Sequence, residues 1–341
     1  MMVAYWPGLV SAAVAPRWSL LAIGLPAISW LDPRRLSTAA LVGLSFGITH
    51  AALTVIAMPA GSGRLTGTLE LYHLLIFGAA ILAGAGLSSL DGVMKGAGAG
   101  MAICSGIAIA QMFGWDGITQ AAVPAALFFN RDILAETAAI LVVWGLFRPV
   151  YWVAAAGAVP LALCQSRTAL LMFGVPFAWW LLRKAPRNTI PALLLLGLGL
   201  GGVALWFSIG PGKIASVSER LMAWSECLHR LSAWGYGLGS FTEAFPRMEY
   251  AHSDILQAAS ELGLGTLFFV APFVVAFRGR SDTEAEPLAL IAGTVCLAVA
   301  FPLHMPASTL LIGLLVGFLA RRREPLRMAR HERRDFVGAV A

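Results

Sequence analysis

The sequence has little charge. Only 12% of its 341 residues are Asp, Glu, Lys or Arg, whereas a soluble globular domain carries about 25%. In the same chain, 58% of the residues are hydrophobic and the mean hydropathy is +0.78. This composition excludes an ordinary soluble domain and predicts an integral membrane protein.

The sequence also lacks the short segments of alternating polarity that are typical of membrane β-barrels. Apolar runs of about 15 to 25 residues recur instead, which indicates an all-α, polytopic membrane protein. The first residues lack a basic segment followed by a small-residue cleavage site, so we expect no removable signal peptide.

Metal-binding patterns are absent from the sequence as well. The four cysteines show no CxxC spacing, and most lie in apolar segments, where free Cys is an ordinary small hydrophobic residue. A disulfide between Cys164 and Cys227 is conceivable outside the cytoplasm. The histidines form no recognisable ligand set, since His252 and Asp254 point apart on a helix. We therefore expect no metal and no cofactor.

Eleven membrane spans are predicted from the apolar runs. They cover residues 8–31, 36–60, 70–88, 96–113, 132–147, 149–164, 168–182, 189–209, 263–277, 287–301 and 306–320. The predicted organisation is thus eight spans within 1–209, one large polar loop over 210–262, three further spans within 263–320 and a basic tail over 321–341.

Basic residues predict the orientation of these spans. Most of the 24 Lys and Arg residues fall in the tail and in one alternating set of loops, which by the positive-inside rule lie in the cytoplasm. This placement explains the net charge of +6 without a nucleic-acid partner, because a basic tail commonly contacts anionic lipid. The loop 210–262 is then extracytoplasmic.

With this topology, several polar residues outside the loop fall on its side of the membrane. They are Asn130, Arg131, Asp132, Ser166, Arg167 and His304. Nothing in the assignment of spans required this clustering. We therefore expect one extracytoplasmic site.

Arg167 and Arg220 are candidate anion ligands. Arg167 begins a predicted helix with Ser166 as its N-cap, where both the helix dipole and the guanidinium favour a phosphate. Arg220 lies in a segment, 218–234, whose apolar residues recur at helical spacing, typical of an amphipathic helix on the outer leaflet. The alternatives are an interfacial Arg167 and a solvated Arg220.

Three alternating glycines, Gly235, Gly237 and Gly239, resemble a nucleotide-binding loop. No βαβ unit surrounds them, so that interpretation fails. A helix C-cap followed by a tight turn is the prediction here, and such a turn can bring backbone close to a ligand.

His252 is the candidate general base, although a lone His is more often structural. It stands at the predicted N-terminus of a helix, whose positive end favours a neutral imidazole, and Asp254 lies in the first turn. Ser253, Gln257 and Glu261 follow at helical spacing and form one polar stripe on an otherwise apolar helix. Such a stripe in a membrane-entering helix requires a partner or a ligand.

Taken together, these motifs resemble the bacterial O-antigen ligase and polysaccharide polymerase family over roughly residues 128–320. The similarity is carried by NRD at 130–132, SRTAL at 166–170, Arg220 with Trp224, GYGLGSF at 235–241, HSDILQAASELGLG at 252–265 and FPLHMPA at 301–307. The outer loop is short for the family, which leaves acceptor recognition open.

The resemblance implies a GT-C-like, inverting, metal-independent glycosyltransferase of the bacterial inner membrane. Its donor would be a glycan on undecaprenyl pyrophosphate, and its acceptor another lipid-linked glycan or lipid A–core, with a slight preference for a polymerase. His252 matches the family's base, Arg167 and Arg220 match its pyrophosphate ligands, and Glu261 matches a following acidic position. The supporting residues are Ser166, Gln257, Asp254, Asn130, Arg131 and His304.

Two other functions are weighed against this one. A transporter or lipid-linked-glycan flippase would place its polar residues near the bilayer midplane, often in inverted repeats. An intramembrane protease would need a Ser or Asp nucleophile inside a span, whereas Ser240 lies in the polar loop.

Overall fold

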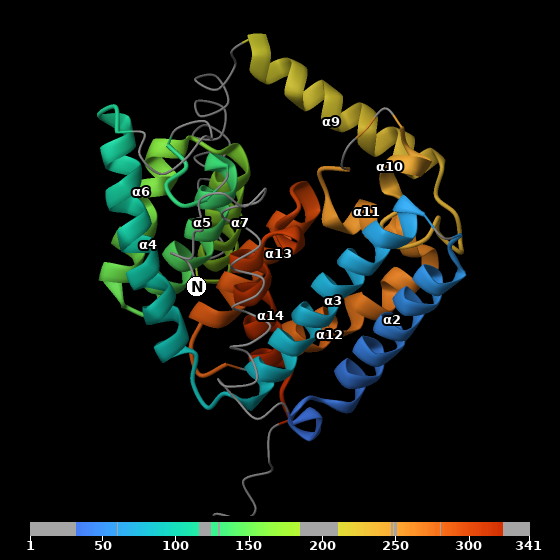
Figure 1. Ribbon diagram of the computed structural model, residues 1–341. Coiled ribbons are helices and arrows are strands. Elements are labelled where there is room, and N and C mark those ends of the chain that lie inside the picture. The colour runs from blue at the N-terminus through green and yellow to red at the C-terminus, as the bar shows by residue number, and fades with distance from the viewer. Residues whose placement is uncertain are drawn as a thin grey trace, which may run out of the picture.

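The computed structural model describes residues 32–59, 61–115, 124–128, 130–184, 211–246, 248, 251–279 and 281–322 (Figure 1). The predicted spans 8–31 and 189–209 and most of the basic tail lie outside the described residues.

The described residues are helical, apart from connections and one isolated bridge between Leu36 and Arg321. This confirms the all-α prediction for that part of the chain. The longer helices are α2 (Thr38–Ala57), α3 (Ser62–Gly86), α4 (Asp91–Met112), α5 (Arg131–Phe147), α6 (Tyr151–Cys164), α7 (Arg167–Lys184), α9 (Pro211–His229), α12 (Thr266–Arg278), α13 (Ala285–Val299) and α14 (Pro306–Ala320). The shorter elements are η1 (Pro33–Arg35), α10 (Phe241–Ala244), α11 (Asp254–Leu262), η2 (Gly263–Gly265) and η3 (Pro302–His304).

Four of the described segments are long and apolar enough to cross a membrane: Thr38–Ala57, Gly63–Gly86, Asp91–Met112 and Asp254–Arg278. The last one runs through α11, η2 and α12. Helices α6, α13 and α14 are apolar but have only 14 or 15 residues, fewer than the about 20 that a straight span needs. Length and composition thus support a membrane protein.

Two boundaries differ most from the sequence prediction. Helix α3 begins at Ser62 rather than near residue 70, so Glu70 and His73 lie in its interior rather than at its start. The segment predicted to enter the membrane at 263 already begins at Asp254. The reason is that this helix is amphipathic. Its stripe containing Gln257 and Glu261 is buried against protein, while Ile255 is exposed.

Helices α13 and α14 lie between two groups of helices (Figure 1). Helices α5 and α7 pack against α13, and α3 and α12 pack against α14. Every residue of α14 is buried. The outer helices instead expose large apolar side chains, as lipid-facing surfaces do; examples are Phe46, Ile56, Leu65, Ile103, Trp179 and Leu267.

Small residues allow α3 and α14 to pack closely. A Cβ atom added at Gly317 would overlap the carbonyl oxygen of Ile81, and one at Gly84 would overlap that of Leu314. Gly313 faces Ala80 across the same interface. Small residues at helix contacts are typical of membrane proteins, where close backbone approach replaces the hydrophobic effect as a driving force.

We therefore predict that Gly317→Ala lowers the melting temperature of the detergent-solubilised protein, because α14 must move away from α3; overpacking of this kind costs about 1–3 kcal/mol. Gly106→Ala on α4 is the matched control, since a Cβ there meets no atom within 4 Å. Equal melting temperatures for the two variants in a thermal-shift assay would contradict this packing.

Candidate functional site

Helix α11 begins as predicted, directly after His252. Ser253 is its N-cap, with a hydroxyl that accepts a hydrogen bond from the Leu256 amide at 3.2 Å. The Asp254 amide donates to the Ala300 carbonyl at 2.9 Å, which attaches the start of α11 to the end of α13. His252 has a φ of 51°, and its ring lies 5.9 Å from that of Phe301, centroid to centroid.

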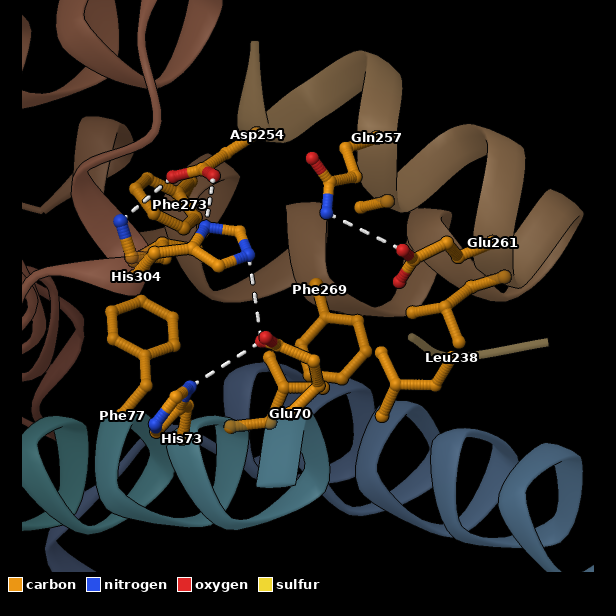
Figure 2. A pocket seen from close by; sticks show the side chains of 14 residues that line it. Glu70, His73, Phe77, Leu238, Asp254, Gln257, Glu261, Phe269, Phe273 and His304 are labelled. Carbon is orange, nitrogen blue, oxygen red and sulfur yellow. Dashed lines mark hydrogen bonds and ion pairs between the residues drawn. The ribbon is translucent and has the colours of Figure 1, made fainter. Parts of the chain in front are cut away.

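The polar stripe on α11 is confirmed, and it is buried. Ser253, Gln257 and Glu261 are each less than 10% exposed, at 2%, 7% and 3%. The Gln257 amide donates to the Glu261 carboxylate at 3.3 Å (Figure 2). The helix thus presents its polar side to the protein interior, which is how a membrane-entering helix can carry such residues.

The glycine motif forms a turn, as predicted, but it does not end α9, which stops at His229. It caps α11 instead. The amides of Tyr236 and Gly237 donate to the last carbonyls of α11, those of Ser260 and Glu261, at 3.0 and 2.8 Å. The Gly239 amide donates to the Glu261 carboxylate at 2.9 Å. Gly237 and Gly239 have φ values of 102° and 77°, where a side chain would be strained.

A chain of ionisable side chains that the sequence analysis missed joins α11 to α3 (Figure 2). Asp254 accepts from the Leu303 amide at 2.7 Å and contacts His304 Nδ1 at 3.0 Å. His304 Nε2 lies 3.4 Å from Glu70 Oε2, and Glu70 lies 3.4 Å from His73 Nδ1. The signal in the sequence was the spacing of Glu70 and His73, three apart in an apolar segment and therefore on one helix face.

These side chains line a cavity of about 90 Å³. Pockets for drug-sized ligands enclose about 300–1,000 Å³, so this one fits a few water molecules rather than a sugar. Its polar lining consists of Glu70, His73, Asp254, Gln257, Glu261 and His304, and its apolar lining of Leu74, Phe77, Leu238, Ala258, Leu262, Phe269, Phe273 and Leu303.

His304 lies in η3, outside the helices on either side. Burial lowers the pKa of His304, but the hydrogen bond to Asp254 and the negative charges of Asp254, Glu70 and Glu261 outweigh burial and raise this pKa from 6.5 to about 9. At neutral pH the imidazole is therefore protonated and bridges two carboxylates.

Arg220 contacts the segment that leads from α13 to η3. Its guanidinium donates to the Val299 carbonyl, at the end of α13, at 3.3 Å. Val299 is two residues from Phe301, which contacts His252. Arg220 and His252, which lie in the same polar loop of the sequence, thus both contact the short segment 299–301.

The remaining predicted residues lie at the starts of helices. Arg167 begins α7, and the buried Ser166 hydroxyl accepts from the Ala169 amide at 3.5 Å. Asn130 is the N-cap of α5, with an oxygen that accepts from the Asp132 amide at 2.7 Å, and Arg131 is exposed beside it. Since α5 and α7 both pack on α13, these residues belong to helices that contact the helix at whose end Arg220 binds.

No group of three or more His, Cys, Asp or Glu residues is arranged to hold a metal ion within the described ranges. All four cysteines are free and buried, so the conceivable Cys164–Cys227 disulfide is not formed.

The chain matches no protein-family model and no curated protein. The motif resemblance therefore depends on the residues quoted above.

We predict that the stability of the protein decreases as pH rises from about 6.5 to about 9. The pKa of His304 is raised to about 9, so its contribution to stability is complete below the unfolded-state value of about 6.5 and is lost as pH passes through the folded-state value. His304→Gln should remove this part of the pH dependence in thermal-shift measurements.

The matched control is His229→Gln, because His229 is exposed on α9. An undiminished loss of stability in His304→Gln would assign the effect to another group.

Proposed function

We propose that the protein is a membrane glycosyltransferase that moves a glycan from undecaprenyl pyrophosphate to an acceptor hydroxyl, as a polysaccharide polymerase or O-antigen ligase. The observation that carries the proposal is the approach of Arg220 and His252 to one segment: Arg220 bonds Val299 at 3.3 Å, and the His252 ring lies 5.9 Å from that of Phe301. These are the residue types that the chemistry needs, and both contact the segment 299–301.

The reaction requires little more than these groups. The acceptor oxygen attacks the anomeric carbon, the bond to the pyrophosphate oxygen breaks with its electron pair, and the hydroxyl proton passes to His252. Because this is one displacement, the configuration inverts. Pyrophosphate is a good leaving group, so the main requirement is to stabilise the charge that develops on it, which the guanidinium of Arg220 does near an apolar boundary.

Arg167 is the second proposed phosphate ligand. It lies in the first turn of α7, where the helix dipole and the free amides favour an anion. Ser166 supports it as the N-cap. Two arginines on separate helices match a ligand that carries more than one phosphate charge.

The proposed orientation puts this end of the helices on the periplasmic face of the inner membrane and the basic C-terminal tail in the cytoplasm. Support comes from the distribution of Lys and Arg in the sequence. The large polar segment 210–262 then lies outside, where lipid-linked glycans are polymerised or ligated.

One observation favours a second function, a proton-linked transporter or flippase. Glu70 and Asp254 lie in segments long and apolar enough to cross a membrane, and the His304 imidazole joins them. Chains of carboxylates and imidazoles within membrane spans are typical of proton-coupled transporters. Uptake of a labelled glycan lipid into proteoliposomes without a glycosidic product would favour this function.

The transferase is tested with purified protein in liposomes and an undecaprenyl-pyrophosphate glycan, offered lipid-linked glycan or lipid A–core as acceptor. We predict that His252→Ala lowers the transfer rate about 10²–10⁴-fold, the usual contribution of a general base. Arg220→Lys should also lower it, because Lys keeps the charge but loses the planar fork that binds phosphate.

His229→Ala, which changes an exposed imidazole elsewhere on α9, should transfer at the wild-type rate. Transfer by His252→Ala at that rate would refute the mechanism, and absence of product with every acceptor would refute the function.

A further inference from the structure

The contacts of His304 connect two parts of the chain that the sequence separates widely. One ring nitrogen contacts Asp254 on α11 at 3.0 Å, and the other lies 3.4 Å from Glu70 on α3. Glu70 in turn contacts His73, one turn along α3. Both imidazole nitrogens thus have a carboxylate partner, an arrangement that only the protonated ring satisfies as a donor at each side.

The cavity beside His304 has an excess of acidic groups. Glu70, Asp254 and Glu261 all line it. Burying ionised carboxylates is costly, and a proton on His304 offsets this cost by placing a positive charge between Asp254 and Glu70. The groups that face this imidazole are Asp254 and Glu261 on α11 and Glu70 on α3, with His73 behind Glu70.

Ring contacts through Phe301 also connect the His304 imidazole to His252, the proposed catalytic base. Its ring lies 6.3 Å from that of Phe301, which in turn lies 5.9 Å from the ring of His252, centroid to centroid. Asp254 also holds the Leu303 amide at 2.7 Å. A change in the Asp254–His304 contact therefore acts on the turn that carries Phe301.

We propose that the cavity between α3, α11 and η3 is a proton-binding site, in which a single proton on His304 joins Glu70 to Asp254 and so fixes the position of Phe301 against His252. The ligand is a proton, exchanged with water that the cavity admits. His304 is a positioning residue in this scheme, and the effect on His252 rests on the proposed function.

Loss of the proton leaves Glu70 and Asp254 without the positive charge between them. Their repulsion then separates α3 from α11, to which the Leu303 amide of η3 is bound, and Phe301 loses its fixed position. The transferase should therefore lose turnover at alkaline pH through kcat rather than through KM, because substrate still binds at Arg220 and Arg167 while the base is displaced.

The first experiment reads the site without any activity. Full-length protein with ¹⁵N-labelled histidine is titrated in lipid nanodiscs, and the His304 signal is assigned by its loss in His304→Gln. The wild-type midpoint is expected at about 9. Glu70→Gln keeps the shape of the side chain and removes its charge, so it should lower the midpoint.

Glu243→Gln is the matched control, because Glu243 is an exposed carboxylate on α10; it should leave the midpoint unchanged. A wild-type midpoint near 6.5, the ordinary value of His, would overturn the proton site without reference to any variant. A Glu70→Gln midpoint equal to that of the wild type would overturn the proton site as well.

The second experiment measures glycan transfer against pH. The wild-type kcat is expected to decline over the pH range in which the His304 NMR signal titrates. In Glu70→Gln this decline should lie at lower pH, by the same interval as the shift of the NMR midpoint. A decline that stays in place while the NMR midpoint moves would overturn the connection to His252. If no variant and no wild type transfers glycan, the proposed function fails, and the NMR titration alone decides the proton site.

Discussion

An ionised side chain that a helix carries into apolar surroundings must find its partner inside the protein. In this chain the constraint is met at His304, which lies between Asp254 and Glu70. The contact attaches α3 to α11 and to the turn between α13 and α14, and it orients the polar stripe of α11 inward. Breaking such a pair leaves a buried charge, which is far more destabilising than never having had the pair.

The glycine turn follows from the same constraint. Glu261 is buried, and its carboxylate accepts hydrogen bonds from the Gly239 backbone amide and the Gln257 side-chain amide. The turn reaches this position because Gly237 and Gly239 adopt positive φ values and because Gly67 on α3 lets the backbone approach. A motif that resembles a nucleotide loop therefore caps α11 and donates a hydrogen bond to a carboxylate on that helix.

Much of the local structure could be predicted from the sequence, because it depends on local signals. Apolar runs indicated the helices, His252 and Asp254 indicated the start of α11, and the spacing of Ser253, Gln257 and Glu261 indicated one polar face. The chain from Glu70 to Asp254 could not be predicted, because it joins residues that are distant in the sequence. Glu136, buried in α5, was missed for the same reason: burial depends on the packing of neighbouring helices.

The bridge formed by His304 is tested most directly by a double-mutant cycle with Glu70→Gln, His304→Gln and the double variant, using free energies of unfolding in bicelles at pH 7. For residues in direct contact, the coupling is typically about 0.5–3 kcal/mol. The structure predicts a coupling in this range that disappears at pH 10, where the imidazole is neutral. Additive effects at pH 7 would contradict the bridge on which the account depends.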